Sequence, residues 1–285
     1  MNPPVRQAPY CDCHIHVFAR DDASRHSSSS QSAYAKAAYQ PPRKDIADFA
    51  TEAAVGGIGR AVLIQASIDG TDNRFLLETL KRARLADNGL AAPLELRGVV
   101  MIDERSEGLA AMADAGVRAI RVQDRSRLGH NDLARLPRLA ERAATQDWHV
   151  ELNTEPERYA ALAALLPTLP SGQALVLDHL GHVTPGASDE LSGLYRLLDT
   201  GRVWIKLAPT RVSRHVGRYD DLGELVRQLA ERYPERCVWG SDWPHVMTPP
   251  PLPASRDMLD FLERVLTPAQ RDACLTHNPA TLYRF

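Results

Sequence analysis

Tyr10-Cys-Asp-Cys-His-Ile-His-Val-Phe18 is an apolar run in which every second position, from Asp12 to His16, is polar. A period of two is typical of a β-strand, because successive side chains point to opposite faces. Asp12, His14 and His16 therefore share one face, and the two small cysteines share the other. The run predicts a strand with imidazoles gathered near its C-terminal end.

Seven further short apolar runs follow, and helix-like segments separate most of them. The runs span residues 61–66, 96–102, 117–122, 148–152, 174–178, 203–207 and 237–240. The predicted helices span residues 73–86, 133–145, 156–166 and 222–233. Strands that alternate with helices pair in parallel, and eight such units in about 250 residues predict an α/β fold, the closed (β/α)8 TIM barrel. A doubly wound sheet is the alternative, but no Gly-x-Gly-x-x-Gly follows an early strand.

One segment interrupts this alternation. Residues 20–42 contain four consecutive serines and end in Pro41-Pro42. Their composition favours a flexible surface loop, whereas a loop after the first strand of a barrel would overhang the active face and could form a lid. With no second domain or internal repeat beyond the strand–helix unit, we expect residues 1–285 to form a single domain.

The composition excludes several classes of protein. The 285 residues include 34 basic and 36 acidic side chains, so the formal net charge is −2 and offers no positive field for nucleic acid. No apolar run approaches the roughly 20 residues that span a bilayer, and the first ten residues lack the apolar centre of a signal peptide. With four cysteines, we expect reduced thiols in a cytoplasmic protein. The sequence does not set the oligomeric state.

Titratable residues occur where three of the predicted strands end. His14 and His16 end the first strand, His179 follows the sixth, and Asp242 and His245 follow the eighth. In a barrel these ends share one face, where active sites form. A carboxylate among imidazoles can take a proton from water, and the imidazoles can polarise a carbonyl directly or through a bound zinc ion. Both arrangements predict addition of water to a carbonyl carbon.

Several of these motifs together resemble a known family. His14-x-His16, Asp178-His179-x-Gly181, the segment from Trp239 to His245 and Asn278-Pro279 are similar to motifs of the amidohydrolase superfamily, and in particular of its amidohydrolase-related lactonases. That group includes 2-pyrone-4,6-dicarboxylate lactonase, and the likeness runs from about Tyr10 to Tyr283. It implies a hydrolase that opens a carboxylated lactone, 2-pyrone-4,6-dicarboxylate or a close analogue, in aromatic-compound catabolism.

The resemblance also implies roles for individual residues. His14, His16 and His179 would surround the scissile carbonyl, Asp242 would activate water, and His245 would lie beside it. The substrate-binding residues that it implies are Arg121, Arg127, Arg211, Tyr39, Ser67 and Asn153. An arginine can grip a carboxylate through two parallel hydrogen bonds, so such a set would select an anionic substrate. Arg118 and Arg125 are expected to pair with acids at the surface instead.

The fifth strand departs from the family pattern. Asn153 stands where the family has an aromatic hydroxyl, and by alternation Glu151 points inward with it. An inward carboxylate needs a partner, which is either Lys206, an arginine or a metal ion. The departure leaves both the substrate and the metal dependence open.

Metal dependence divides this group of lactonases. The arginine set resembles the metal-independent member, so we expect no required cofactor. The alternative is a single divalent metal such as zinc on His14, His16, His179 and Asp242, with Glu151 as a further candidate ligand. Two other enzymes remain alternatives: a sugar-acid lactonase, which would need more hydroxyl-binding groups, and a zinc-dependent decarboxylase. A non-catalytic binding protein is disfavoured because the histidine and aspartate set is intact.

Overall fold

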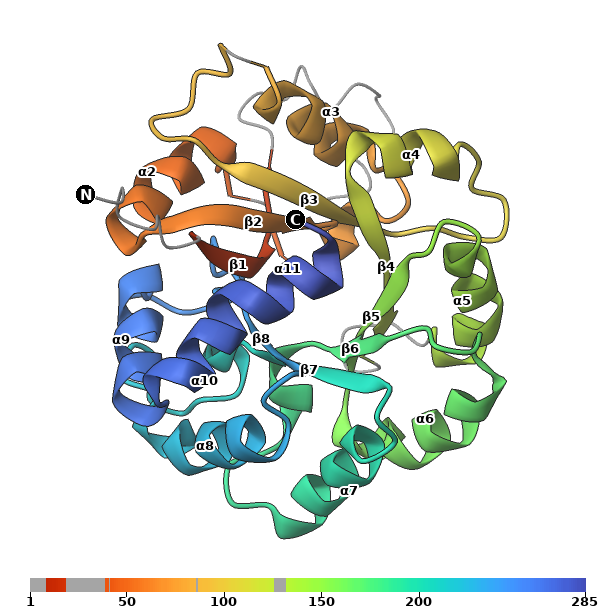
Figure 1. The fold of residues 1–285 in the computed structure, drawn as a ribbon, viewed down its shortest axis with the longest axis vertical. Coiled ribbons are helices and arrows are strands. Elements are labelled where there is room, and N and C mark those ends of the chain that lie inside the picture. Colours follow the sequence, from red (N-terminus) through yellow and green to blue (C-terminus); the bar gives the residue numbers. More distant parts are fainter. Residues whose placement is uncertain (1–8, 19–38, 41, 86, 126–131) are drawn as a thin grey trace, which may run out of the picture.

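The computed structural model describes residues 9–18, 39–40, 42–85, 87–125 and 132–285. Eight parallel strands follow one another around the sheet in chain order, as Figure 1 shows. They are β1 (Tyr10–Ile15), β2 (Ile58–Ile64), β3 (Glu95–Val100), β4 (Val117–Asp124), β5 (His149–Thr154), β6 (Leu175–Leu177), β7 (Val203–Leu207) and β8 (Cys237–Trp239). The predicted (β/α)8 barrel is confirmed. Of residues 20–42, predicted as a surface loop or a lid, only 39, 40 and 42 are among the described residues.

Helices surround the barrel, and the last two of them cover one of its ends, as Figure 1 shows. The helices are α2 (Ile46–Gly56), α3 (Arg74–Ala83), α4 (Leu109–Ala115), α5 (Leu136–Ala144), α6 (Tyr159–Leu165), α7 (Ser188–Leu198), α8 (Gly223–Arg232), α9 (Ser255–Val265), α10 (Pro268–Asp272) and α11 (Asn278–Tyr283). The four predicted helices are present as α3, α5, α6 and α8. Across the described parts of the chain, no helix has the length and apolar character needed to cross a membrane.

The barrel closes between β1 and the segment that follows β8. The backbone N–H of Asp242 donates to the carbonyl of His14 (2.9 Å), and that of His16 donates to the carbonyl of Trp243 (2.8 Å). A Cβ atom on Gly240 would lie 2.5 Å from the Cβ of His14, so the close approach requires glycine. The Asp12 carboxylate joins the same seam, because its Oδ1 accepts from the backbone N–H groups of His14 (3.1 Å) and Ser241 (2.9 Å). Closure of the fold therefore brings His14 and Asp242 together.

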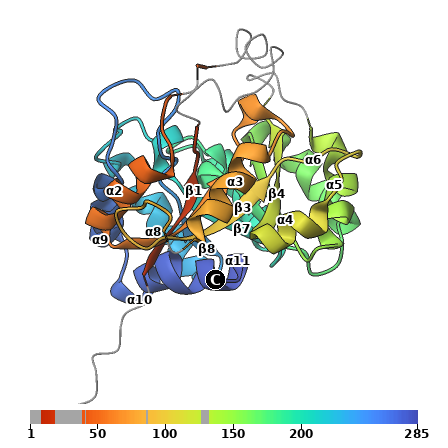
Figure 2. The same ribbon diagram turned by 90° about the horizontal axis from the view of Figure 1, so that it is seen from above.

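The C-terminal helices α10 and α11 cover the end of the barrel at which β8 begins, as Figure 2 shows. The side-chain amide of Asn278 donates to the carbonyls of Pro234 (2.8 Å) and Cys237 (2.7 Å), which ties α11 to the start of β8. π-helical residues 273–277 lead directly into α11, so Asn278 lies within a continuous helical stretch and its side chain is available for these carbonyls. Tyr283 is fully buried and reaches the barrel interior from this end.

Candidate active site

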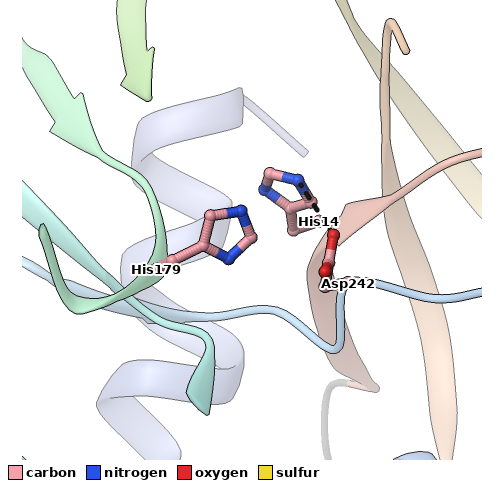
Figure 3. A group of neighbouring side chains, drawn as sticks. All are labelled: His14, His179 and Asp242. Carbon is pink, nitrogen blue, oxygen red and sulfur yellow. Dashed lines mark ion pairs between the residues drawn. The ribbon is translucent and has the colours of Figure 1, made fainter. Parts of the chain in front are cut away.

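Three strand ends bring the predicted catalytic residues together. His14 lies on β1 and His16 directly follows it, His179 follows β6 and Asp242 follows β8. Oδ1 of Asp242 lies 3.5 Å from Nε2 of His16 and 3.7 Å from Nε2 of His14. The ring centroids of His14 and His179 are 4.8 Å apart. Figure 3 shows the side chains of His14, His179 and Asp242 pointing toward one another.

The backbone after β6 and β8 adopts an uncommon conformation that aims these side chains. His179, Asp242 and His245 have φ angles of 49°, 64° and 62°. A positive φ is rare for residues other than glycine, and such strain is typical of functional sites. At Gly181, where φ is 64°, a Cβ atom would lie 2.3 Å from the hydroxyl of Tyr159, so the turn after His179 needs glycine there.

A cavity of about 620 Å³ opens above this cluster, within the range of small-molecule sites. Its lining includes His16, His179, Asp242, Tyr39, Ser67, Gln123, Asn153, His182, Thr210, Arg121, Arg125, Arg211 and Arg214. His14 is fully buried beneath this surface. His245 is buried beside Asp242, to whose carbonyl its backbone N–H donates (2.8 Å), and it is not part of the lining.

Asp242 is held as a carboxylate despite its burial. Burial alone would raise the pKa of Asp242, but Arg211, His179 and the nearby ring of His16 together hold that pKa well below its usual value of 3.8. Nε of Arg211 lies 2.5 Å from Oδ2, which leaves Oδ1 toward the histidines. The carboxylate is therefore ionised and available to accept a proton at neutral pH.

The arginines of the cavity differ in their partners. Arg121 donates to Asp178 (3.2 Å) and to the carbonyl of Gln65 (3.1 Å). Arg211 pairs with Asp242, as described above. Of the arginines that line the cavity, Arg214 has no carboxylate partner among the described residues. The predicted Arg127 lies outside those residues.

Arg125 corrects one sequence-based expectation. It was expected to pair with an acid at the surface, and it does pair with Glu155 (2.9 Å), but its side chain is only 8% exposed and lines the cavity. Its guanidinium also contacts the ring of His182, and Nε2 of His182 lies 2.8 Å from Oδ1 of Asn153. Arg125 and His182 are thus cavity residues that the sequence analysis missed, and Asn153 is held by one of them.

A buried ionic network lies under the cavity. Nζ of Lys206 on β7 lies 2.6 Å from Oε2 of Glu151 and 3.1 Å from Oδ1 of Asp178, and the hydroxyl of Tyr283 donates to Oε1 of Glu151 (2.7 Å). Asp178 in turn lies 3.3 Å from Nδ1 of His14. The inward Glu151 therefore has Lys206 as a partner, one of the options left open by the sequence. Burial would raise the pKa of Asp178, but Lys206, His14 and Arg121 lower it well below the usual value.

The donor atoms present also fit a single divalent cation. Ligand atoms of His14, His179 and Asp242 lie within 4.8 Å of one another, and so do those of His14, Glu151 and Asp178. In the described part of the chain, Nε2 of His14, Nδ1 of His179 and both carboxylate oxygens of Asp242 lack a hydrogen-bond donor or acceptor that satisfies normal geometry. Imidazole and carboxylate are the ligand types that zinc takes in catalytic sites. The first of these groups is the one that faces the cavity.

Buried histidines should make the protein less stable as the pH falls below about 6.5. Burial lowers the pKa of His14 to about 3 and also lowers the pKa of His149, His179 and His245, so the unfolded chain binds more protons than the folded chain below 6.5. Asp12 opposes this effect, because burial raises its pKa from 3.8 to about 7 and the folded chain holds that proton. With four histidines against one aspartate, we expect the free energy of unfolding to fall by up to about 4 kcal/mol per pH unit. Urea denaturation at pH 7.5, 6.5 and 5.5 measures the free energy of unfolding. A free energy of unfolding that does not change with pH would contradict the lowered pKa values of the buried histidines.

Comparison with known proteins agrees with this geometry. A model of the amidohydrolase family matches residues 11–285. The chain is 27% identical to 4-sulfomuconolactone hydrolase of Rhizobium radiobacter over 99% of its own length and 94% of the relative's. It is 28% identical to 2-pyrone-4,6-dicarboxylate hydrolase of Comamonas testosteroni, over 80% of the chain and 76% of the relative. A crystal structure from Pseudomonas putida, assigned as a 2-pyrone-4,6-dicarboxylic acid hydrolase, has a TM-score of 0.76 at 29% identity and covers 97% of this chain and 98% of its own. The resemblance seen in the motifs is confirmed, and the chain belongs to the amidohydrolase family.

Proposed function

We propose that the protein hydrolyses the ring ester of a small carboxylated lactone, with 2-pyrone-4,6-dicarboxylate or a close analogue as the preferred substrate. The observation that carries the proposal is the buried carboxyl group of Asp242 beside His16, at the base of a cavity lined by four arginines. The lactone hydrolases among the relatives support the same reaction class.

In this mechanism Asp242 is the general base. Oδ1 takes a proton from a water molecule while the water oxygen bonds to the lactone carbonyl carbon, and the carbonyl oxygen gains negative charge. His14, His16 and His179 surround this oxygen. His14 and His179 stabilise its charge as hydrogen-bond donors, whereas the N–H of a neutral His16 is at Nδ1 and donates to the carbonyl of Ile64 (2.8 Å). Collapse of the intermediate breaks the bond to the ring oxygen, and the proton held by Asp242 returns to that leaving oxygen. His245 supports the position of Asp242 from behind.

Arginine side chains of the cavity would bind the carboxylates of the substrate. Arg121, Arg127 and Arg211 are the proposed carboxylate-binding groups, and Arg214 joins them because it lines the cavity without a carboxylate partner among the described residues. Tyr39, Ser67 and Asn153 are proposed to hydrogen-bond substrate oxygens, since all three line the same cavity.

A bound divalent metal would be held by His14, His179 and Asp242, with His16 adjacent. It would supply Lewis acidity toward the carbonyl oxygen and a lower pKa for a bound water molecule. Our proposal does not require it, since a carboxylate base and imidazole donors are already in place.

Ring opening can be followed directly by the loss of ultraviolet absorbance of a conjugated pyrone. The purified protein should hydrolyse 2-pyrone-4,6-dicarboxylate faster than an uncharged pyrone and faster than sugar-acid lactones. The assay is run before and after chelator treatment, together with metal analysis of the protein. Absence of turnover with every lactone, with or without added zinc, would contradict the proposal, whereas carbon dioxide release would identify the decarboxylase.

Arg214 provides a test of the anionic substrate. Arg214→Gln should raise the KM for the dicarboxylate about tenfold with little change in kcat, because one charge-assisted hydrogen bond to a substrate carboxylate is lost. Arg218→Gln is the matched control, since Arg218 is exposed on the same loop and does not line the cavity. Equal KM values for the two variants would show that Arg214 does not contribute to substrate binding.

A further inference from the structure

Lys206 is a fully buried lysine that lies inside the barrel, below the cavity rather than in its lining. Its neighbours Glu151 and His14 are also fully buried, and Asp178 is 1% exposed. Nζ of Lys206 lies 2.6 Å from Oε2 of Glu151, 3.0 Å from Nδ1 of His14 and 3.1 Å from Oδ1 of Asp178. The ammonium group thus has three close polar partners.

The number of donors decides the state of His14. An ammonium group has three N–H donors and no acceptor, and an unpaired donor in a protein interior is costly. Glu151 accepts one of these hydrogens (2.6 Å), and Asp178 lies at ion-pair distance (3.1 Å). The contact of 3.0 Å between Nζ and Nδ1 of His14 is a hydrogen bond only if Nδ1 is the acceptor, because the ammonium group can only donate. A neutral imidazole with a bare Nδ1 carries its proton on Nε2.

We propose that Lys206 is a positioning residue that fixes His14 as the Nε2–H tautomer, so that His14 presents an N–H donor toward the cavity. Nε2 lies 3.7 Å from Oδ1 of Asp242, at the point where Figure 3 shows the ring of His14 facing that carboxylate. The catalytic use of this donor rests on the proposed function, because it would stabilise the charge that develops on the lactone carbonyl oxygen.

Asp178 provides the alternative state. Its Oδ1 lies 3.3 Å from Nδ1 of His14 and can accept a proton from that nitrogen only if Lys206 does not donate to it. Without Lys206, the proton would move to Nδ1 and leave Nε2 bare, which is the form that binds a metal ion. Lys206 therefore favours the tautomer of His14 that donates a hydrogen bond from Nε2 over the tautomer that can bind a metal ion through Nε2. Zinc can bind to His14 in the wild type only after the proton leaves Nε2.

A charge-balanced pair of variants tests this assignment. Glu151→Gln combined with Lys206→Met removes one negative and one positive charge, and Asp178 keeps its contact with Arg121 (3.2 Å). Glu151→Gln alone is the matched control, because it keeps Lys206 on His14. The full-length proteins are labelled with ¹⁵N-histidine, and the tautomer of His14 is read from its long-range ¹H–¹⁵N correlations. A His14→Gln spectrum assigns the signals, and zinc affinity is measured by competition with a chelator.

We expect His14 to be protonated at Nε2 in the wild type and in Glu151→Gln, and at Nδ1 in the double variant. Zinc should bind the double variant at least about tenfold more tightly, and kcat for the lactone without metal should fall roughly 10²-fold. Wild-type His14 protonated at Nδ1 would overturn the proposal, and this measurement does not depend on the variants folding. An unchanged tautomer in the double variant would overturn it as well. The spectra need no substrate, so a wild-type protein that hydrolyses no lactone would contradict the proposed function and leave the tautomer assignment standing.

Discussion

Asp242→Asn should lower kcat by up to about 10⁴-fold, the upper range for loss of a general base, while the Kd of the substrate stays within about threefold. Asparagine has the same shape as aspartate and tolerates the left-handed backbone at this position, where φ is 64°. The amide cannot take a proton from water. Arg211 loses its contact of 2.5 Å with the carboxylate and stays available for an anionic substrate, so binding should not weaken.

Asp147→Asn is the matched control for this prediction. Asp147 also has a positive φ, 56°, but it is exposed on the turn that precedes β5 and does not line the cavity. Asp147→Asn therefore shows what an aspartate-to-asparagine substitution does in left-handed backbone outside the cavity. The variants are compared by the pyrone absorbance assay for kcat and by calorimetry for binding. An Asp242→Asn protein that keeps more than a tenth of the wild-type kcat would remove Asp242 as the base.

Most of the strands were predictable because both faces of a barrel strand are buried, which gives short, nearly continuous apolar runs. Every predicted strand is present, with boundaries that shift by a few residues. The helices were less predictable. In α4, which spans Leu109–Ala115, only Ala115 is buried, so the sequence carries almost no apolar periodicity. The helix is bounded instead by Gly108 and Gly116, which both have left-handed backbone. α2 had a usable signal in Asp45 and Asp48, which form a capping box.

The gathering of the candidate catalytic residues was predictable for a related reason. Parallel strands end at one face, so histidines and an aspartate at three strand ends had to lie close together. The pairing among charges was not predictable. Arg125 was expected to pair with an acid at the surface. The fourth strand continues to Asp124, two residues beyond its predicted end, and Arg125, which follows it, lines the cavity. The pairing of Arg211 with Asp242 depends on how two loops meet, which periodicity does not encode.

Lys206→Met should destabilise the protein by about 3–5 kcal/mol, the largest stability effect that we expect from one substitution. The change leaves Glu151 and Asp178 in the interior without the cation between them, although Asp178 keeps Arg121. Burial opposes ionisation of Glu151, and Lys206 lowers its pKa below the usual value, so loss of the lysine removes what holds this carboxylate charged. Urea denaturation at pH 7.5 measures the difference.

The double variant Glu151→Gln with Lys206→Met should recover most of this loss, because a neutral amide can still accept from the hydroxyl of Tyr283, now 2.7 Å from Oε1 of Glu151. Lys81→Met serves as the surface control, since Lys81 is exposed on α3. If the two lysine variants lose similar stability, the ammonium of Lys206 does not hold the interior carboxylates in place. If the double variant is as unstable as Lys206→Met, the loss arises from packing of the lysine side chain rather than from the uncompensated charge of Glu151.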